Sequence, residues 1–218
     1  MTALLLGSVL PNIEVETTTG KFKLHDYQGD SWLLFFSHPA DFTPVCTTEL
    51  ARVVQLNSEF QKRNVKLIAL SCDDLEAHKS WSCDVTAYAG SKDQLPYPII
   101  ADKTREIALM FGMLDAHAKD AGGVALTARA CFIFGPDRTL HLSILYPASV
   151  GRNFTEIIRV IDALQLSAAN KIVTPVDWKQ GESVIVPPVG KAEDYPNKVE
   201  IEKLPSGKEY LRWTTVNK

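Results

Sequence analysis

The chain has 218 residues and a formal net charge of −3; 45% of its residues are hydrophobic and 22% are charged. These values are ordinary for a globular protein with room for one good-sized domain and a small appendage. They exclude the basic balance of a nucleic-acid-binding protein, and no long run of Lys or Arg occurs, so we expect no nucleic-acid partner.

The sequence shows no segment that predicts export or membrane insertion. Residues 1–8 have neither the basic region nor the apolar length of a secretory signal, and no apolar stretch approaches the ~20 residues that cross a bilayer. Four cysteines occur without a CxxC pair: Cys46, Cys72, Cys83 and Cys131. Without a secretory signal they do not indicate disulfides. We therefore expect a cytoplasmic protein without a transmembrane segment.

The first predicted elements surround a polar stretch at residues 37–49. Residues 7–23 are expected to form loops and short strands, followed by a polar turn at 25–31. The apolar block at 32–36 predicts a buried strand. After the polar stretch, apolar residues are spaced for one face of a helix: Leu50, Val53, Val54 and Phe60. That helix is expected to run to about Lys62, with Asn64 as a left-handed stop.

The remaining elements of the first domain alternate between strands and helices. In chain order we expect a strand at residues 65–70, a helix capped by Asp73 or Asp74, a short strand at 96–101, a short helix at 104–110, an irregular loop at 115–128, a hairpin of strands at 130–134 and 140–144, and a helix that Asn153 and Glu156 open as a capping pair. This order predicts an α/β layered fold.

The sequence changes in character from about residue 166, where prolines separate short strand-like pieces. Residues 200–204 and 209–213 flank a turn at 205–208, which predicts a hairpin. Because roughly 50 residues rarely hold a core alone, this segment is expected to pack on the first domain or on a second subunit. We therefore divide the chain into domains at residues 1–165 and 166–218.

Cys46 occupies a position that favours the thiolate form of a cysteine. Pro44 suits the first position of the predicted helix and Thr43 the cap before it, so Cys46 falls in the first turn. The amides of a first turn have no intrahelical acceptors, and the helix end carries partial positive charge. Since a helix end alone contributes about 1 kcal/mol, we expect a nearby cation to assist.

The pattern Pro39-x-x-x-Thr43-x-x-Cys46 resembles the active-site signature of the peroxiredoxins, and Ser37-His38-Pro39 resembles their one-cysteine branch, the peroxiredoxin-6 group. The resemblance covers nearly the whole chain. It implies a thioredoxin-like fold with a small C-terminal β-rich domain. It also implies a peroxidase for hydrogen peroxide and organic or lipid hydroperoxides, acting through a cysteine sulfenic acid, with a role in antioxidant defence and redox homeostasis.

The resemblance also suggests roles for residues around Cys46. Arg129 matches the family's active-site arginine, and Arg152 resembles a second one that orients the site, although a lone arginine is often a surface charge. The Thr43 hydroxyl and the Cys46 amide are close enough in sequence to donate to the peroxide oxygens. Pro39 offers an apolar wall that limits access of water.

Two further residues near the motif have open interpretations. Glu49 is placed to accept a hydrogen bond from one of these arginines, or it is a solvated helix carboxylate. His38 either contacts the approach to Cys46 and binds substrate, or is a satisfied histidine of the core or surface. We expect no metal and no cofactor, because Cys72, His78 and Cys83 match no zinc-binding spacing.

The remaining cysteines favour a one-cysteine mechanism. No cysteine follows Cys131, and Cys72, Cys83 and Cys131 are each expected to serve as small apolar residues. An external thiol is then needed to reduce the sulfenic acid. The family implies glutathione for this step, delivered with a glutathione S-transferase, and a homodimer formed through edge strands and the C-terminal piece.

Two alternative functions stay open. The peroxiredoxin-6 group is also credited with a calcium-independent phospholipase A2 activity, whose Ser/His/Asp set matches Ser31, His25 and Asp137. However, Leu33 replaces the last glycine of the Gly-x-Ser-x-Gly motif, and turn and loop positions would explain the three residues equally well. The second alternative is a peroxide sensor that relays oxidation at Cys46 to a partner protein.

Overall fold

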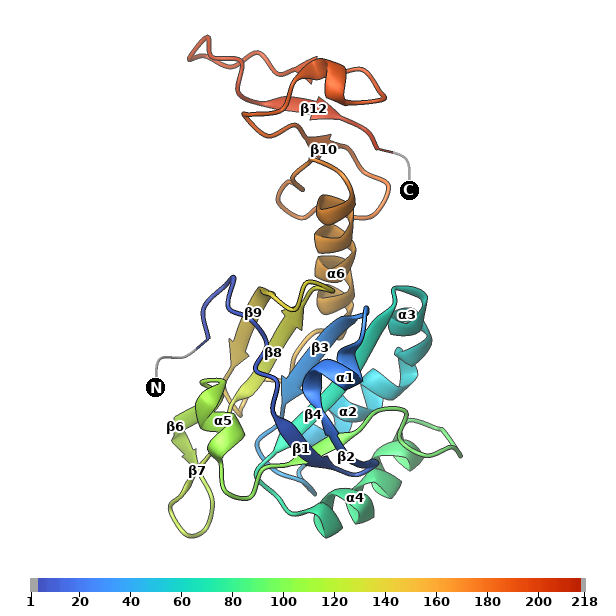
Figure 1. Ribbon diagram of the computed structural model, residues 1–218, viewed down its shortest axis with the longest axis vertical. Coiled ribbons are helices and arrows are strands. Elements are labelled where there is room, and N and C mark those ends of the chain that lie inside the picture. Colours follow the sequence, from blue (N-terminus) through green and yellow to red (C-terminus); the bar gives the residue numbers. More distant parts are fainter. Residues whose placement is uncertain (1–3, 217–218) are drawn as a thin grey trace. The chain divides into compact units, whose positions relative to one another are not determined.

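The computed structural model of the protein describes residues 4–216. The chain divides between Phe154 and Thr155 into two compact units, called here the N-terminal and C-terminal units. The N-terminal unit contains a seven-stranded sheet in the order β2-β1-β5-β4-β3-β8-β9 (Figure 1). Its strands are β1 (Glu14–Thr17), β2 (Gly20–Lys23), β3 (Trp32–Ser37), β4 (Val65–Ser71), β5 (Ile99–Ala101), β8 (Arg129–Phe134) and β9 (Leu140–Tyr146).

Strand β3 lies between β4 and β8 in this sheet, and all six of its side chains are buried. It pairs in parallel with β4 and antiparallel with β8, so the sheet is mixed. The helices of the unit are α1 (Leu24–Gln28), α2 (Pro44–Gln55), α3 (Asn57–Lys62), α4 (Leu75–Tyr88) and α5 (Glu106–Met110). The α/β architecture expected from the sequence is therefore confirmed.

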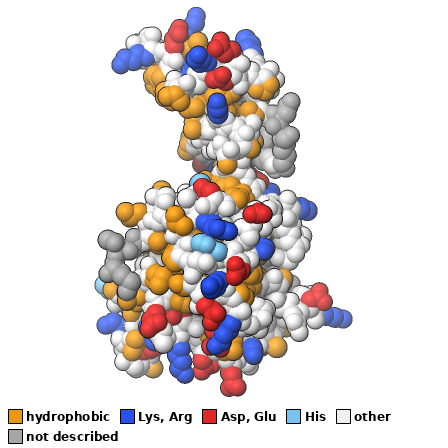
Figure 2. Space-filling view, viewed as in Figure 1, with side chains coloured by type: hydrophobic (Ala, Val, Ile, Leu, Met, Phe, Trp, Pro, Cys, Tyr) orange, Lys and Arg blue, Asp and Glu red, His pale blue; other side chains and the backbone are white. Residues whose placement is uncertain are grey.

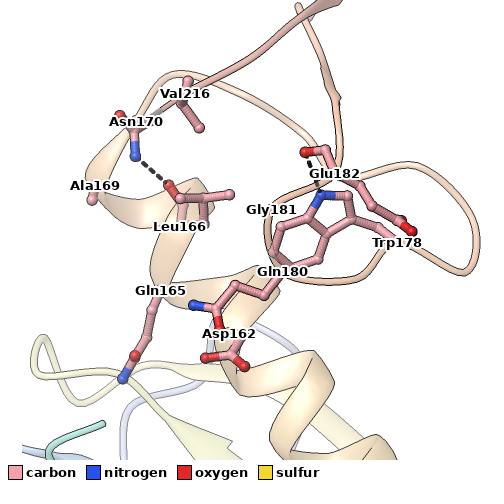
Figure 3. Close-up of a pocket in the computed structure, with 10 residues that line it drawn as sticks. All are labelled: Asp162, Gln165, Leu166, Ala169, Asn170, Trp178, Gln180, Gly181, Glu182 and Val216. Atoms are coloured by element: carbon pink, nitrogen blue, oxygen red, sulfur yellow. Dashed lines mark hydrogen bonds between the residues drawn. The ribbon is translucent and has the colours of Figure 1, made fainter. Parts of the chain in front are cut away.

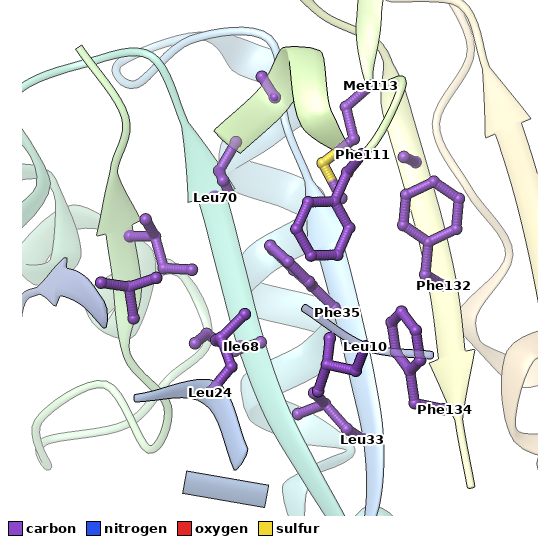
Figure 4. Packing of buried hydrophobic residues seen from close by; sticks show 14 of the residues in the cluster. Leu10, Leu24, Leu33, Phe35, Ile68, Leu70, Phe111, Met113, Phe132 and Phe134 are labelled. Carbon is purple, nitrogen blue, oxygen red and sulfur yellow. The ribbon is translucent and has the colours of Figure 1, made fainter. Parts of the chain in front are cut away.

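An aromatic cluster fills one face of the sheet (Figure 4). The rings of Phe35 and Phe111 meet edge to face with their centroids 4.8 Å apart, and Phe132 and Phe134 pack around Phe111. Because successive side chains of a strand point to opposite faces, Phe36 lies on the other face, where its ring meets Tyr97. Burial on both faces makes β3 a rigid support for the loop that follows it.

The structure corrects three local predictions. Residues 25–31, expected to be a turn, include most of the five-residue helix α1, which is too short to show helical periodicity. The expected irregular loop at 115–128 contains a hairpin of β6 (Leu114–Lys119) and β7 (Ala125–Thr127), whose strands have almost none of the β-branched and aromatic residues that indicate a strand. The helix expected to reach Lys62 is interrupted at Leu56, although Asn64 is left-handed as predicted, with φ 52°.

The C-terminal unit has its own small core. It comprises most of α6 (Phe154–Ala169) and a three-stranded sheet in the order β10-β12-β11. Its elements after α6 are β10 (Val184–Ile185), the short 3-10 helix η1 (Ala192–Asp194), β11 (Glu200–Ile201) and β12 (Arg212–Thr214). The antiparallel pairing of β11 with β12 confirms the predicted hairpin. Trp178 is 1% exposed and packs with Val184 and Val186.

The C-terminal unit also contains a cavity of about 310 Å³ beside Trp178 (Figure 3). The Trp178 indole N–H donates to the Glu182 carbonyl oxygen at 3.2 Å, and Leu166 and Val216 contribute apolar walls.

On the visible face of both units, basic and acidic side chains are interspersed rather than segregated (Figure 2). Within residues 4–216, no helix is long and apolar enough to cross a bilayer.

Candidate active site

The loop between β3 and α2 carries the predicted motif. Helix α2 begins at Pro44, with Thr43 as its extended N-cap residue, so Cys46 lies in the first turn as expected. The Thr43 side chain does not cap the helix; instead its hydroxyl donates to the Ala40 carbonyl oxygen at 2.8 Å. Phe42 holds a left-handed φ of 53°, which turns the chain between the end of β3 and the helix.

Cys46 is fully buried and contacts one cation directly. Arg129 Nη1 lies 3.3 Å from Cys46 Sγ, at hydrogen-bond distance for sulfur. Arg129 is the first residue of β8, and the antiparallel register pairs Phe36 with Cys131. That register places Arg129 beyond the carboxyl end of β3, where the loop to α2 begins. The guanidinium is held from its other side by the Ala148 carbonyl oxygen.

Glu49 joins the two predicted arginines. One of its oxygens lies 2.8 Å from both Arg129 Nη1 and Arg152 Nη2, and the other accepts from the Arg152 backbone amide at 2.7 Å. Burial raises the pKa of Glu49, but the guanidinium groups of Arg152 and then Arg129 bring it below its usual value. Glu49 is therefore an ionised carboxylate that fixes both arginines, and the solvated alternative does not apply.

Arg152 supports the site without contacting Cys46 Sγ by any hydrogen bond described for residues 4–216. Its guanidinium is buried between the rings of Phe36 and Phe154, 5.6 and 5.3 Å from their centroids. It donates to the Ala130 carbonyl oxygen at 2.7 Å and lies 3.7 Å from Cys131 Sγ. Arg152 thus orients Glu49 and braces the start of β8.

The charges of this cluster leave room for one anion. Arg129 and Arg152 contribute two positive charges and Glu49 one negative charge, all with side chains at most 3% exposed. The sum is one positive charge beside a buried sulfur. Because an unbalanced buried charge is costly, the cluster favours one further negative charge beside the Cys46 sulfur.

His38 is enclosed rather than facing a substrate path. Its side chain is buried, and Nε2 lies 2.7 Å from Asp41 Oδ1. The other carboxylate oxygen of Asp41 lies 2.6 Å from Nδ1 of His78, which is also buried. Asp73 accepts from the Asp41 backbone amide at 2.9 Å. Since these groups serve one another as hydrogen-bond partners, the cluster is a polar network in its own right.

The other predicted residues have these positions. Pro39 is buried in the loop. All four cysteines are free thiols. Burial, reinforced by the Asp102 carboxylate, raises the pKa of Cys72 to about 11, and burial also raises that of Cys131. Cys83 is exposed on α4, which corrects its assignment as a small apolar residue of the interior.

The three candidate lipase residues have separate hydrogen-bond partners. Ser31 Oγ donates to Asn64 Oδ1 at 2.8 Å, and His25 Nε2 lies 2.6 Å from the Leu10 carbonyl oxygen. Asp137 interacts with Thr139 and His141. Among the described residues, no hydrogen bond joins any two of the three. The lipase reading stays a prediction of the sequence.

The comparisons with known proteins agree with this geometry. Residues 6–143 match the AhpC/TSA family and residues 163–198 match the C-terminal domain of 1-Cys peroxiredoxin. Rat and human peroxiredoxin-6 are 57% and 55% identical over 217 residues, with 97% of each chain covered. The chain belongs to the peroxiredoxins, in their one-cysteine, peroxiredoxin-6 group. It is a thiol-dependent peroxidase, as the motif predicted.

Solved structures place this peroxiredoxin in the same group. A mutant of the peroxiredoxin 6 of Arenicola marina superposes with a TM-score of 0.94 at 55% identity, covering 97% of this chain and 98% of that one. The yeast mitochondrial 1-Cys peroxiredoxin gives a TM-score of 0.87 at 42% identity, covering 97% and 99% of the two chains. The thioredoxin-like fold with an added C-terminal domain is thereby confirmed.

Sequence reasoning missed part of the site. The sequence indicates no role for Asp41, and it places His78 on one side of the helix after Asp74 and in a metal pattern with the wrong spacing. The i, i+3 spacing of His38 and Asp41 was the available signal. The contact between Asp41 and His78 spans 37 positions, so no local pattern predicted it.

Proposed function

We propose that Cys46 is the nucleophile of this thiol-dependent peroxidase. The observation that carries the proposal is the 3.3 Å contact between Arg129 Nη1 and Cys46 Sγ, in a buried cluster with one uncompensated positive charge. The thiolate donates an electron pair to the terminal peroxide oxygen, so that an S–O bond forms and the O–O bond breaks. The other oxygen leaves as hydroxide or alkoxide and takes up a proton, giving water or an alcohol.

Arg129 and Thr43 have different tasks in this step. Arg129 donates to the sulfur and is held in place by Glu49, so it can stabilise negative charge that spreads toward the peroxide oxygens. The proton of the Thr43 hydroxyl is engaged by the Ala40 carbonyl. We therefore assign the Thr43 oxygen as an acceptor for the peroxide O–H, rather than as the donor expected from the sequence.

The sulfenic acid is then reduced by an external thiol. Two of the other three thiols are buried with raised pKa values, which makes them poor resolving nucleophiles. The yeast mitochondrial 1-Cys peroxiredoxin, of which a thiol resolving mechanism via glutathione and thioredoxin systems is described, supports such a route. Glutathione, delivered by a glutathione S-transferase in the cytoplasm, is the reductant we propose.

We further propose that the protein works as a homodimer. Large apolar side chains are exposed on the C-terminal unit, where Val176 is 87% and Val189 is 91% exposed. Burying such side chains against a second copy would remove apolar surface from water. Sedimentation of the wild type and of Val176→Asp with Val189→Asp tests this: the wild type should sediment as a dimer and the double variant as a monomer.

Separate cysteine variants test the peroxidase assignment. Cys46→Ser should abolish thiol-dependent consumption of hydrogen peroxide, whereas Cys83→Ser, which changes an exposed thiol, should leave it unchanged. Mass spectrometry after trapping with a sulfenic-acid reagent should locate the adduct on Cys46. Full peroxide consumption by Cys46→Ser would refute the proposal.

A further inference from the structure

A buried network of two histidines and an aspartate lies at the loop between β3 and α2. His38 and Asp41 belong to the loop that leads into α2, while His78 belongs to α4. All three side chains are at most 1% exposed. Buried ionisable groups at such distances must divide their protons in a defined way, because side chains this little exposed depend on one another for their hydrogen bonds.

The contacts of His78 define its protonation. Its Nε2 lies 3.1 Å from the Ile100 carbonyl oxygen, which can only accept, so Nε2 must carry a proton. Its Nδ1 lies 2.6 Å from Asp41 Oδ2. Burial raises the pKa of Asp41, but the hydrogen bonds from His38 and His78 hold it below its usual value. With an ionised carboxylate as acceptor, Nδ1 carries a proton too, and the ring is an imidazolium.

The contacts of His38 indicate a neutral ring rather than an imidazolium. Its Nε2 donates to Asp41 Oδ1, whereas its Nδ1 is buried with no hydrogen-bond partner within the described residues. A proton on that nitrogen would place an unpaired donor and a second cation in the interior. His38 is therefore neutral, and the network consists of one cation, one anion and one neutral ring.

This network holds the active-site loop from behind. Asp41 lies two residues before Thr43, and its backbone amide donates to Asp73. The His38 carbonyl oxygen accepts from the Thr127 hydroxyl at 2.6 Å. The Trp81 ring packs on the His38 ring, 4.9 Å between centroids, and its indole N–H donates to Thr47 in the turn that carries Cys46.

We propose that His78 is a positioning residue whose imidazolium, acting through Asp41 and His38, keeps the loop between β3 and α2 in the geometry that the attack by Cys46 requires. Loss of the His78 proton removes the cation that pairs with Asp41, releases the loop and slows the reaction. This proposal rests on the role of Cys46 proposed above.

Several charged groups face His78. The loop contributes Asp41, which contacts the ring, and His38, whose ring lies 6.3 Å away between centroids, and the turn before α4 contributes Asp74. His78 adds to the interactions that lower the pKa of Asp74, after the Ala77 amide and Lys103. From β5 the facing group is the Ile100 carbonyl, which does not titrate. The charged group that contacts the His78 ring is therefore the Asp41 carboxylate.

Nuclear magnetic resonance on the wild type tests the proton count without any substitution. Nitrogen-15 spectra of the histidine rings near neutral pH should show protons on both nitrogens of His78 and on Nε2 alone of His38. A bare ring nitrogen on His78 near pH 7 would overturn the proposal. Because this measurement does not involve Cys46, it stands even if the nucleophile is another residue.

The predicted slowing on loss of the His78 proton is tested by the rate of Cys46 oxidation. This rate is measured with hydrogen peroxide by rapid mixing over the alkaline range. The wild type should lose rate at high pH, and His78→Gln should react about tenfold more slowly with no alkaline loss. Lys79→Gln, at the exposed neighbouring position, should match the wild type. A slow His78→Gln that kept the alkaline loss would indicate a structural role only, and an unchanged rate would also refute the proposal.

Asp41→Asn supplies a second variant should His78→Gln not fold. Asparagine has nearly the size of aspartate and keeps an oxygen that can accept from the His78 N–H. The charge that stabilises the His78 cation is lost, so the alkaline loss of rate should move to lower pH. An alkaline limb at the wild-type position would contradict the proposal.

Discussion

Arg129 Nη1 lies 3.3 Å from Cys46 Sγ, although 83 positions separate the two residues in the chain. The antiparallel pairing of β8 with β3 produces this proximity, because it brings the first residue of β8 to the end of β3, where the loop to the cysteine begins. The register of β8 against β3 thus positions the guanidinium, and the first turn of α2 positions the sulfur.

Removing this guanidinium should slow peroxide reduction. Arg129→Met keeps much of the side-chain bulk but leaves the sulfur without its cationic donor, so we expect kcat/KM for hydrogen peroxide to fall by about 10²-fold or more. Steady-state kinetics with saturating thiol measure the effect. Arg52→Met, on the exposed side of α2, is the matched control and should react as the wild type does. Comparable rates for the two variants would show that Arg129 has no part in the reaction.

Neutralising Glu49 should destabilise the fold as well as the site. Glu49→Gln removes the carboxylate that pairs with both buried guanidinium groups, and the expected loss in free energy of unfolding is about 3–5 kcal/mol at neutral pH. Urea denaturation followed by circular dichroism measures it. Glu76→Gln changes an exposed glutamate on α4 and should cost less than about 0.5 kcal/mol.

The same carboxylate predicts a pH dependence of stability. The pKa of Glu49 is lowered in the folded protein, so its contribution is complete above the ordinary glutamate value of about 4.3 and is lost as pH falls through the lower, folded value. The difference in unfolding free energy between wild type and Glu49→Gln should therefore shrink as the solution is acidified below about pH 4. A difference that stayed constant into this acid range would contradict the assignment.

The buried thiol of Cys72 and the exposed thiol of Cys83 should react differently with an alkylating reagent. Because burial and Asp102 raise the pKa of Cys72 to about 11, that thiol should remain unmodified by iodoacetamide in the folded protein at mildly alkaline pH. Exposed Cys83 should be labelled under the same conditions, and unfolding in urea should expose all four cysteines. Peptide mass spectrometry identifies the labelled positions. Rapid labelling of Cys72 in the native state would show that the structure around this thiol opens to solvent.

Ser31 provides a test of the lipase alternative. Its hydroxyl donates to Asn64, and the buried Leu33 occupies the position of the motif's last glycine, so we expect Ser31→Ala to leave both peroxide turnover and any hydrolysis of phospholipid vesicles unchanged. The lost hydrogen bond should cost about 1 kcal/mol of stability. Loss of vesicle hydrolysis in this variant alone would instead support a lipase nucleophile.

Local patterns predicted the parts of the site that lie close together in sequence. The apolar run before the motif identified β3, and Pro44 at the first helical position placed Cys46 in the first turn, because both depend on periodicity and backbone geometry within a few residues. The resemblance to the peroxiredoxins supplied Arg129 and Arg152. The hairpin of β6 and β7 escaped prediction because, apart from Thr127, its strands contain no β-branched or aromatic residue.

Only the tertiary structure decided how the distant groups combine. Glu49 meets Arg152 across 103 positions, and Asp41 meets His78 across 37. No local pattern specifies such pairs, because strand register and helix packing bring them together and burial then fixes their charges. The sequence by itself determined a cysteine at a helix start after a buried strand. The fold decided which charges surround that cysteine, since electrostatic interactions depend on distance in space rather than along the chain.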